Sequence, residues 1–98
     1  MSHSRVVPLD ADRAAVHEAK AGRLRVLLAT SPQKRRIAEH VSLGCKNSEI
    51  ARELGCSVDN VRSLLHQTYK RVGLGGRVEL GVLFSEIARN LWSTRDPD

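Results

Sequence analysis

The stretch NSEIARELGCSVDNVRSLLH, residues 47–66, decides the fold. Two helices that cross closely need a small residue at the crossing, a turn residue free to adopt positive φ, and an apolar residue on the second helix. Ala51, Gly55 and Val61 occupy these three positions. Ser57 can cap the second helix, because its hydroxyl can accept a hydrogen bond from a free N–H group. The pattern predicts a helix-turn-helix, a unit whose second helix typically lies in the major groove of DNA.

The positive charge of the chain is concentrated around this motif. Residues 31–77 hold nine Lys or Arg and four Asp or Glu, a surplus of five that equals the net charge of +5 for all 98 residues. A basic segment between near-neutral flanks is typical of a surface that binds phosphate. The alternative is a basic surface without a ligand, so charge supports the DNA-binding interpretation without establishing it.

Length and composition exclude several other classes of protein. Ninety-eight residues are enough for one domain with a modest core. No run of about twenty apolar residues occurs, so we expect no membrane span. The N-terminus lacks the apolar stretch of a signal peptide, and we expect a cytoplasmic protein. One Phe, one Trp and one Tyr are too few for the stacking platforms that bind RNA or single strands.

The first thirty residues carry a weaker helical pattern. Residues 10–28 are rich in Ala and Leu, but Gly22 interrupts them, which leaves either one strained helix or two short ones. Leu9, Val16 and Leu27 align on one face, although Lys20 and Arg23 lie among them. We expect residues 1–29 to form an N-terminal helical extension of the motif-bearing domain.

The rest of the chain predicts four helices with clear ends. Ser31-Pro32 reads as an N-cap followed by a proline in the first turn of a helix that extends to about residue 42, with Ile37 and Val41 facing inward. Helices at 47–54 and 58–72 form the central motif. A glycine-rich break precedes a last helix at about 77–92, and we expect a disordered tail at 93–98.

The motifs in this region resemble those of the LuxR/GerE-type DNA-binding domain. They are Ser-Pro at 31–32, GCKNSEIA at 44–51, LGCS at 54–57, RVG at 71–73 and RVEL at 77–80. The resemblance covers about residues 30–91. It implies an all-α fold, a four-helix LuxR/GerE-like bundle with a central helix-turn-helix, here with an extra N-terminal helical segment. It also implies a 30–92 domain that binds DNA as a dimer and regulates transcription.

Two residues depart from the pattern of that family. The chain has Lys34 where the family usually carries a glutamate, and Leu64 where it usually carries a histidine. The first departure can change how the helix from residue 32 is anchored, and both are compatible with a divergent DNA site.

The exposed face of the 58–72 helix carries the predicted base contacts. Inward positions at helical spacing are Val61, Leu64, Leu65 and Val72. In the resembling family the positions of Arg62, Ser63 and His66 face base edges, and Asp59 lies at the N-terminal end of the same face. Arg62 is the strongest candidate, because a guanidinium fits the O6 and N7 acceptors of guanine. The alternative is that Arg62 only forms a surface ion pair with Asp59.

Phosphate contacts are expected from helix starts and loops, where free N–H groups favour an anion. The predicted backbone contacts are Lys46, Asn47, Ser48, Ser57, Asn60, Lys70, Arg71 and Arg77. The basic run 34–36 is more typical of a solvated helix face and is left out of the site.

No metal, cofactor or catalytic site is expected. The spacing of His40, Cys45, Cys56 and His66 fits no common zinc pattern, and both cysteines suit small apolar positions. No phosphate-binding glycine loop, carboxylate pair or nucleophile with an adjacent base is apparent, so we expect no enzyme activity.

The last helix predicts a homodimer. Its core stripe is formed by Leu80, Leu83, Phe84, Ile87 and Leu91. Beside that stripe lies the predicted dimer interface, composed of Val78, Gly81, Val82, Ser85, Ala88 and Trp92. The alternative is one broad core-facing surface with an exposed Trp92.

The sequence therefore predicts a homodimeric, sequence-specific regulator of transcription that binds double-stranded DNA. Residues 1–29 are too short for the sensor or receiver domain that the resembling family usually carries. One rival is region 4 of a sigma factor, which shares the Glu-Ile-Ala and Leu-Gly-x-Ser elements but lacks the Gly-rich link into a long apolar helix. The other is a protein-interaction adaptor that acts through RNA polymerase or another regulator.

Overall fold

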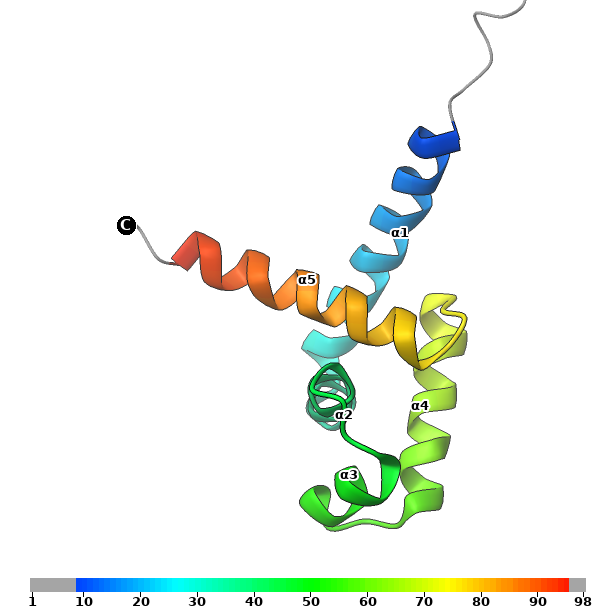
Figure 1. Ribbon diagram of the computed structural model, residues 1–98, viewed down its shortest axis with the longest axis vertical. Coiled ribbons are helices and arrows are strands. Elements are labelled where there is room, and N and C mark those ends of the chain that lie inside the picture. Colours follow the sequence, from blue (N-terminus) through cyan, green and yellow to red (C-terminus); the bar gives the residue numbers. More distant parts are fainter. Residues whose placement is uncertain (1–8, 96–98) are drawn as a thin grey trace, which may run out of the picture.

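The computed structural model describes the backbone of residues 9–95 and the side chains of residues 12–90. Within this part the chain is helical, with no strand, and the predicted all-α fold is confirmed (Figure 1). The helices are α1 (Leu9–Thr30), α2 (Pro32–Ser42), α3 (Asn47–Leu54), α4 (Val58–Val72) and α5 (Arg77–Arg95). None of them combines the length and the apolar character that a membrane crossing requires.

Local hydrogen bonds start α2, α3 and α4 where the sequence predicts. The Ser31 hydroxyl accepts from the Lys34 N–H at 3.3 Å, so α2 is anchored by Ser31 and Pro32 without an acidic residue in its first turn. The Lys46 N–H donates to the Glu49 carboxylate at 2.7 Å at the start of α3. The Ser57 hydroxyl accepts from the N–H of Asn60 at 3.0 Å, which caps α4 as predicted.

Two glycines end the helices of the central motif in the left-handed conformation. Gly55 has a φ of 69° after α3, and Gly73 has a φ of 88° after α4. A residue with a Cβ is strained at such angles, so glycine allows the chain to turn directly from α3 into α4. Ala51 is buried at the crossing of these two helices, as the spacing predicts.

All five helices contribute to one core. Its most completely buried large side chains are Leu24, Ile37, Ile50, Leu80, Leu83, Val61 and Val72. Thr68 is the buried polar residue of this part of the chain, and its hydroxyl donates to the Leu64 carbonyl at 2.8 Å. The core therefore holds α4 by one face and leaves the opposite face in solvent.

Helix α1 is continuous, which is one of the two predicted alternatives, and its buried face differs from the prediction. It continues through Gly22 as one helix. The predicted apolar stripe is wrong at Val16, which is 54% exposed, and correct at Leu27, whereas the Leu9 side chain lies outside the described residues. The buried face of the described part consists of Ala21, Leu24, Leu27 and Leu28. The reason is that only the C-terminal half of α1 packs on the core, whereas its N-terminal half projects from it (Figure 1).

Two polar side chains of α1, Lys20 and His17, contact α5. The Lys20 ammonium donates to the Glu79 carboxylate at 2.8 Å, and His17 Nε2 lies 2.7 Å from the Glu86 carboxylate. Both acidic partners belong to α5. Helix α1 is therefore fastened to α5 by polar contacts where its apolar face ends.

Helix α5 packs across α2 through Leu80, Leu83 and Ile87, which are buried as predicted. A Cβ built on Gly81 would lie 3.6 Å from the Ser42 Cα, an ordinary contact distance, so Gly81 lies on the face of α5 that packs against the end of α2. The helix extends to Arg95, beyond the predicted end at Trp92. Residues 96–98 of the predicted tail lie outside the described residues, as do the side chains of Leu91 and Trp92.

Candidate nucleic-acid interface

The side chains predicted to contact bases share the exposed face of α4. Arg62, Ser63 and His66 are exposed, and so is Asp59 in the first turn. Val61 is buried on the opposite face, and Leu65 is buried beside the exposed face. Because one face of α4 is buried in the core, the other face exposes these four side chains to solvent, as the helical spacing predicts.

These side chains line one groove together with residues from the starts of α3 and α5. The groove has a volume of about 600 Å³, and we call it the recognition groove. Its lining residues are Asn47, Asp59, Arg62, Ser63, Leu65, His66, Tyr69 and Arg77. Two of the predicted phosphate contacts, Asn47 and Arg77, are thus brought beside all four predicted base contacts.

Arg62 and Asp59 form an ion pair in the recognition groove. Arg62 Nη1 donates to Asp59 Oδ1 at 3.2 Å, and the side chains are 67% and 92% exposed. The pair that the sequence suggested as an alternative to base contact is therefore present. Exposed pairs of this kind contribute about 0.2–1 kcal/mol, too little to prevent the guanidinium from reaching a base.

Arg77 fixes the start of α5 to the start of α3. Its Nη1 donates to the Asn47 side-chain oxygen at 2.7 Å, and its Nη2 donates to the Cys45 carbonyl oxygen. Both Arg77 and Asn47 are partly buried. These two residues therefore have a structural role that the sequence did not indicate, in addition to their place beside the recognition groove.

Tyr69 is a groove residue that the sequence analysis missed. Partial burial raises the pKa of its hydroxyl, and the nearby Arg77 guanidinium opposes this rise. The hydroxyl therefore stays protonated at neutral pH and can donate a hydrogen bond to a phosphate or base. Its position three residues after His66 on the helical face is the signal that could have identified it.

The remaining predicted phosphate contacts surround the groove or lie away from it. Lys46, Ser48, Ser57, Asn60 and Lys70 are exposed around α3 and α4 but do not line the recognition groove. Arg71 lies beside α1, in a different groove that it shares with Glu18 and Gly22. The structure therefore does not bring Arg71 together with the other predicted contacts.

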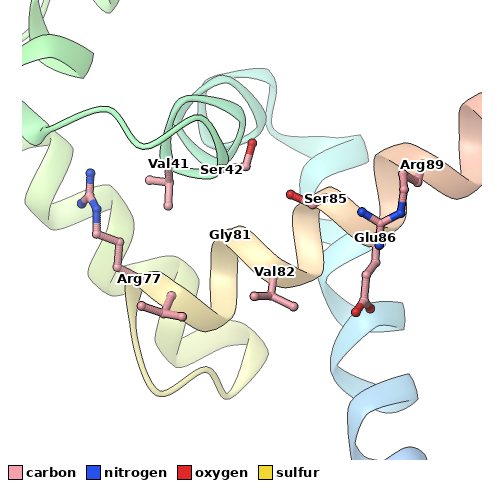
Figure 2. Close-up of a pocket in the computed structure, with 9 residues that line it drawn as sticks. Val41, Ser42, Arg77, Gly81, Val82, Ser85, Glu86 and Arg89 are labelled. Carbon is pink, nitrogen blue, oxygen red and sulfur yellow. The ribbon is translucent and has the colours of Figure 1, made fainter.

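The predicted dimer residues divide between two faces of α5. Val78, Gly81, Val82 and Ser85 line a cavity of about 450 Å³ beside the end of α2 (Figure 2). Val78 is 81% exposed and Val82 48%, whereas Gly81 faces α2. Ala88 lies in a separate groove between α1, α2 and α5. The Trp92 side chain is outside the described residues.

Both cysteines are unbridged and partly buried, and they pack against the core as the sequence predicts. Among the described residues, no three His, Cys, Asp or Glu side chains lie where they could share a metal ion. The cysteines therefore serve as small packing residues beside the central motif.

Comparison with known proteins supports the helix-turn-helix. Residues 32–72 match the family model described as sigma-70, region 4. No characterised protein and no solved structure matches the chain. The matched segment spans α2, α3 and α4, and it does not single out the LuxR/GerE type. It favours the family that the sequence analysis treated as a rival. Residues 32–72 therefore form a helix-turn-helix that is similar to region 4 of sigma-70 factors.

Proposed function

We propose that the chain is a sequence-specific regulator of transcription that places α4 in the major groove of double-stranded DNA. The observation that carries this proposal is the recognition groove, in which all four predicted base contacts converge on the exposed face of α4. A helix of this kind reads bases with side chains near its N-terminal end. Asp59, Arg62 and Ser63 lie in the first half of α4, and His66 lies just beyond its midpoint.

Cationic side chains near the groove suit the DNA backbone. Arg77 lines the groove, and Lys46 and Lys70 are exposed on the surface near α3 and α4. The N–H groups in the first turn of α3 also favour a phosphate near Asn47 and Ser48. Such contacts set the orientation of α4 on the duplex, whereas Arg62 supplies base selection through guanine.

Selection from a pool of random duplex DNA at near-physiological salt tests the proposal. We expect an enriched motif, and we expect Arg62→Ala to weaken binding to it by about 1–3 kcal/mol and to relax the preference at one base. The control is Arg35→Ala, which removes an exposed arginine from α2 and should leave base preference unchanged. Recovery of no motif, with binding that disappears as salt rises, would contradict the proposal.

We further propose a LuxR/GerE-type homodimer formed through α5. The support is the exposed apolar face of Val78 and Val82 on a helix that lies outside the sigma-like segment. A symmetric pair would bind an inverted repeat with half-sites about one helical turn apart. Sedimentation velocity should show a dimer that Val78→Glu dissociates. Val26→Glu, at an exposed valine of α1, is the control and should remain dimeric.

A protein-interaction adaptor is the second candidate function. It is favoured by the similarity to sigma-70 region 4, a domain that contacts RNA polymerase, and by the groove of about 740 Å³ between α1, α2 and α5. That groove has a largely apolar lining that includes Val26, Pro32 and Phe84. Stable binding to purified core RNA polymerase, lost in Val26→Glu and retained in Arg62→Ala, would favour the adaptor over the DNA regulator.

A further inference from the structure

We propose that Asp59 is a positioning residue that holds Arg62 in the orientation required to read guanine and thereby sets the base specificity of α4. This inference rests on the proposed function, since it assumes that α4 enters the major groove. It assigns Asp59 a role through Arg62, which differs from the direct base contact that the sequence predicts.

The geometry of the pair leaves the guanidinium able to reach a base. Asp59 precedes Arg62 by three residues, so the two side chains lie on the same face of α4 one turn apart. The hydrogen bond of 3.2 Å uses Nη1 of Arg62, and a guanidinium has five N–H donors in a rigid planar fork. Donors on the other edge of that plane can still form the paired hydrogen bonds to O6 and N7 of guanine.

Orientation matters because an unrestrained arginine samples many rotamers. Arg62 is 67% exposed, and its ion pair with Asp59 favours the rotamers that keep the guanidinium on the exposed face of α4. Restraining the side chain before binding lowers the entropy lost when it orders against a base. Once the groove of DNA excludes water, the hydrogen bond to Asp59 also becomes stronger than it is in solvent.

The negative charge of Asp59 also weakens the binding of α4 to DNA sites that lack guanine at the position contacted by Arg62. Asp59 is the one carboxylate among the residues that line the recognition groove, and its side chain is 92% exposed. A carboxylate brought into a DNA groove is repelled by the phosphates whatever the base sequence. That repulsion weakens binding to every sequence, whereas the hydrogen bonds of Arg62 to O6 and N7 form only where guanine is present. Asp59 therefore widens the gap between specific and non-specific binding.

A purely structural role for Asp59 makes a different prediction. A carboxylate in the first turn of a helix is stabilised by the free N–H groups there, so Asp59 also favours the start of α4. That effect changes the stability of the helix independently of Arg62. A positioning role instead requires that the effect of Asp59 on base preference depend on the presence of Arg62.

The test is a double-mutant cycle on base preference. Wild type, Asp59→Asn, Arg62→Ala and the double variant are each titrated with the DNA duplex selected from the random pool. Each is also titrated with duplexes altered at the base that Arg62 reads. The control is Glu53→Gln, which removes an exposed carboxylate of α3 that does not line the groove. Thermal unfolding of every variant verifies that it is folded at the temperature of the titration.

We expect Asp59→Asn to reduce the preference for guanine by about tenfold, within the range of one bidentate contact. We also expect it to tighten binding to unrelated DNA. In the Arg62→Ala background the same substitution should leave the preference among bases unchanged. Glu53→Gln should preserve the full preference for guanine.

Two results overturn the inference and can be told apart. If Asp59→Asn keeps the full preference for guanine, or alters the preference equally with and without Arg62, Asp59 does not position Arg62 and only this inference fails. If the wild-type protein itself shows no base preference, the proposed function fails and the inference fails with it.

Discussion

Arg23 of α1 caps the C-terminal end of α4 by donating two hydrogen bonds to the Val72 carbonyl oxygen. Its Nε lies 3.0 Å and its Nη2 2.8 Å from that oxygen. The last carbonyl groups of a helix lack partners within the helix, and a cation is favourable beside them. The N-terminal extension is therefore joined directly to the helix that carries the candidate base contacts.

This contact predicts that Arg23→Ala lowers the free energy of unfolding by about 1.5–3 kcal/mol, the range for hydrogen bonds to a charged group. The Val72 carbonyl would lose its partner from α1, and α1 would lose a fixed point on the core. Urea unfolding followed by circular dichroism measures the change. Arg25→Ala removes an exposed arginine two residues further along α1, and we expect it to change stability by less than about 0.5 kcal/mol. Equal losses in the two variants would contradict the capping role.

The hydrogen bonds of the Glu79 carboxylate predict that the protein loses part of its stability at acidic pH. Its carboxylate accepts from the Gly75 N–H at 2.8 Å and from the Lys20 ammonium at 2.8 Å. The backbone hydrogen bond first, and then Lys20, lower the pKa of Glu79 from its ordinary value of 4.5. The unfolded chain then binds the proton more tightly than the folded chain. The contribution of Glu79 to stability is therefore complete above pH 4.5 and is lost as the pH falls through the lowered pKa.

The measurement is the free energy of unfolding between pH 7 and pH 3 for wild type and Glu79→Gln. The glutamine variant should be less stable at pH 7, and the two should converge as the pH falls. Glu53→Gln, at an exposed position of α3, should stay parallel to wild type across the range. A constant difference between Glu79→Gln and wild type at every pH would show that Glu79 does not contribute through its ionised form.

The left-handed conformation of Gly55 predicts that a substitution there lowers the free energy of unfolding through backbone strain and not through a steric clash. Its φ is 69°, and a Cβ built on it has no neighbour within 4 Å. Gly55→Ala should therefore lower the free energy of unfolding by about 1–2 kcal/mol through backbone strain alone. Gly76 is the matched control, because a Cβ there also has no neighbour within 4 Å and its φ is not in the left-handed region. Chemical denaturation of Gly76→Ala should show no loss of stability, and a similar loss in both variants would exclude strain as the cause.

The helices of the central motif could be predicted from sequence because their signals are local. Ser31, Ser57 and Gly55 each act on backbone groups within a few residues, and helical spacing alone separates buried Val61 from exposed Arg62. The ion pair between Arg62 and Asp59 could also be predicted from the sequence, because its partners are three residues apart.

Contacts between residues far apart in sequence could not be predicted in this way. Lys20 looked like an interruption of an apolar stripe, because its partner Glu79 is 59 residues away. Arg77 looked like a free cation for phosphate, since its partner Asn47 is 30 residues away. Polar contacts of this kind depend on how helices cross, and helix periodicity carries no information about the crossing.

The substitution Arg77→Lys separates a structural role of Arg77 from a role in phosphate binding. Lysine keeps the positive charge but cannot bridge the Asn47 side chain and the Cys45 carbonyl with one planar fork. If Arg77 mainly fixes the start of α5 to the start of α3, Arg77→Lys should lower the free energy of unfolding by about 1–3 kcal/mol. Asn47→Ala should produce part of the same loss. Because the two side chains act on one contact, the double variant should lose less stability than the sum of the single variants.

A phosphate contact alone predicts the opposite pattern for the same substitution. Lysine also binds phosphate as a point charge, so Arg77→Lys would then leave the urea midpoint unchanged and retain most of the affinity for duplex DNA. Arg71→Lys provides the comparison, because Arg71 is exposed on the α1 side of α4 and lies outside the recognition groove. Urea unfolding and DNA titration of both variants therefore decide between the two roles. A loss of stability confined to Arg77→Lys identifies the guanidinium of Arg77 as a structural link between the starts of α3 and α5.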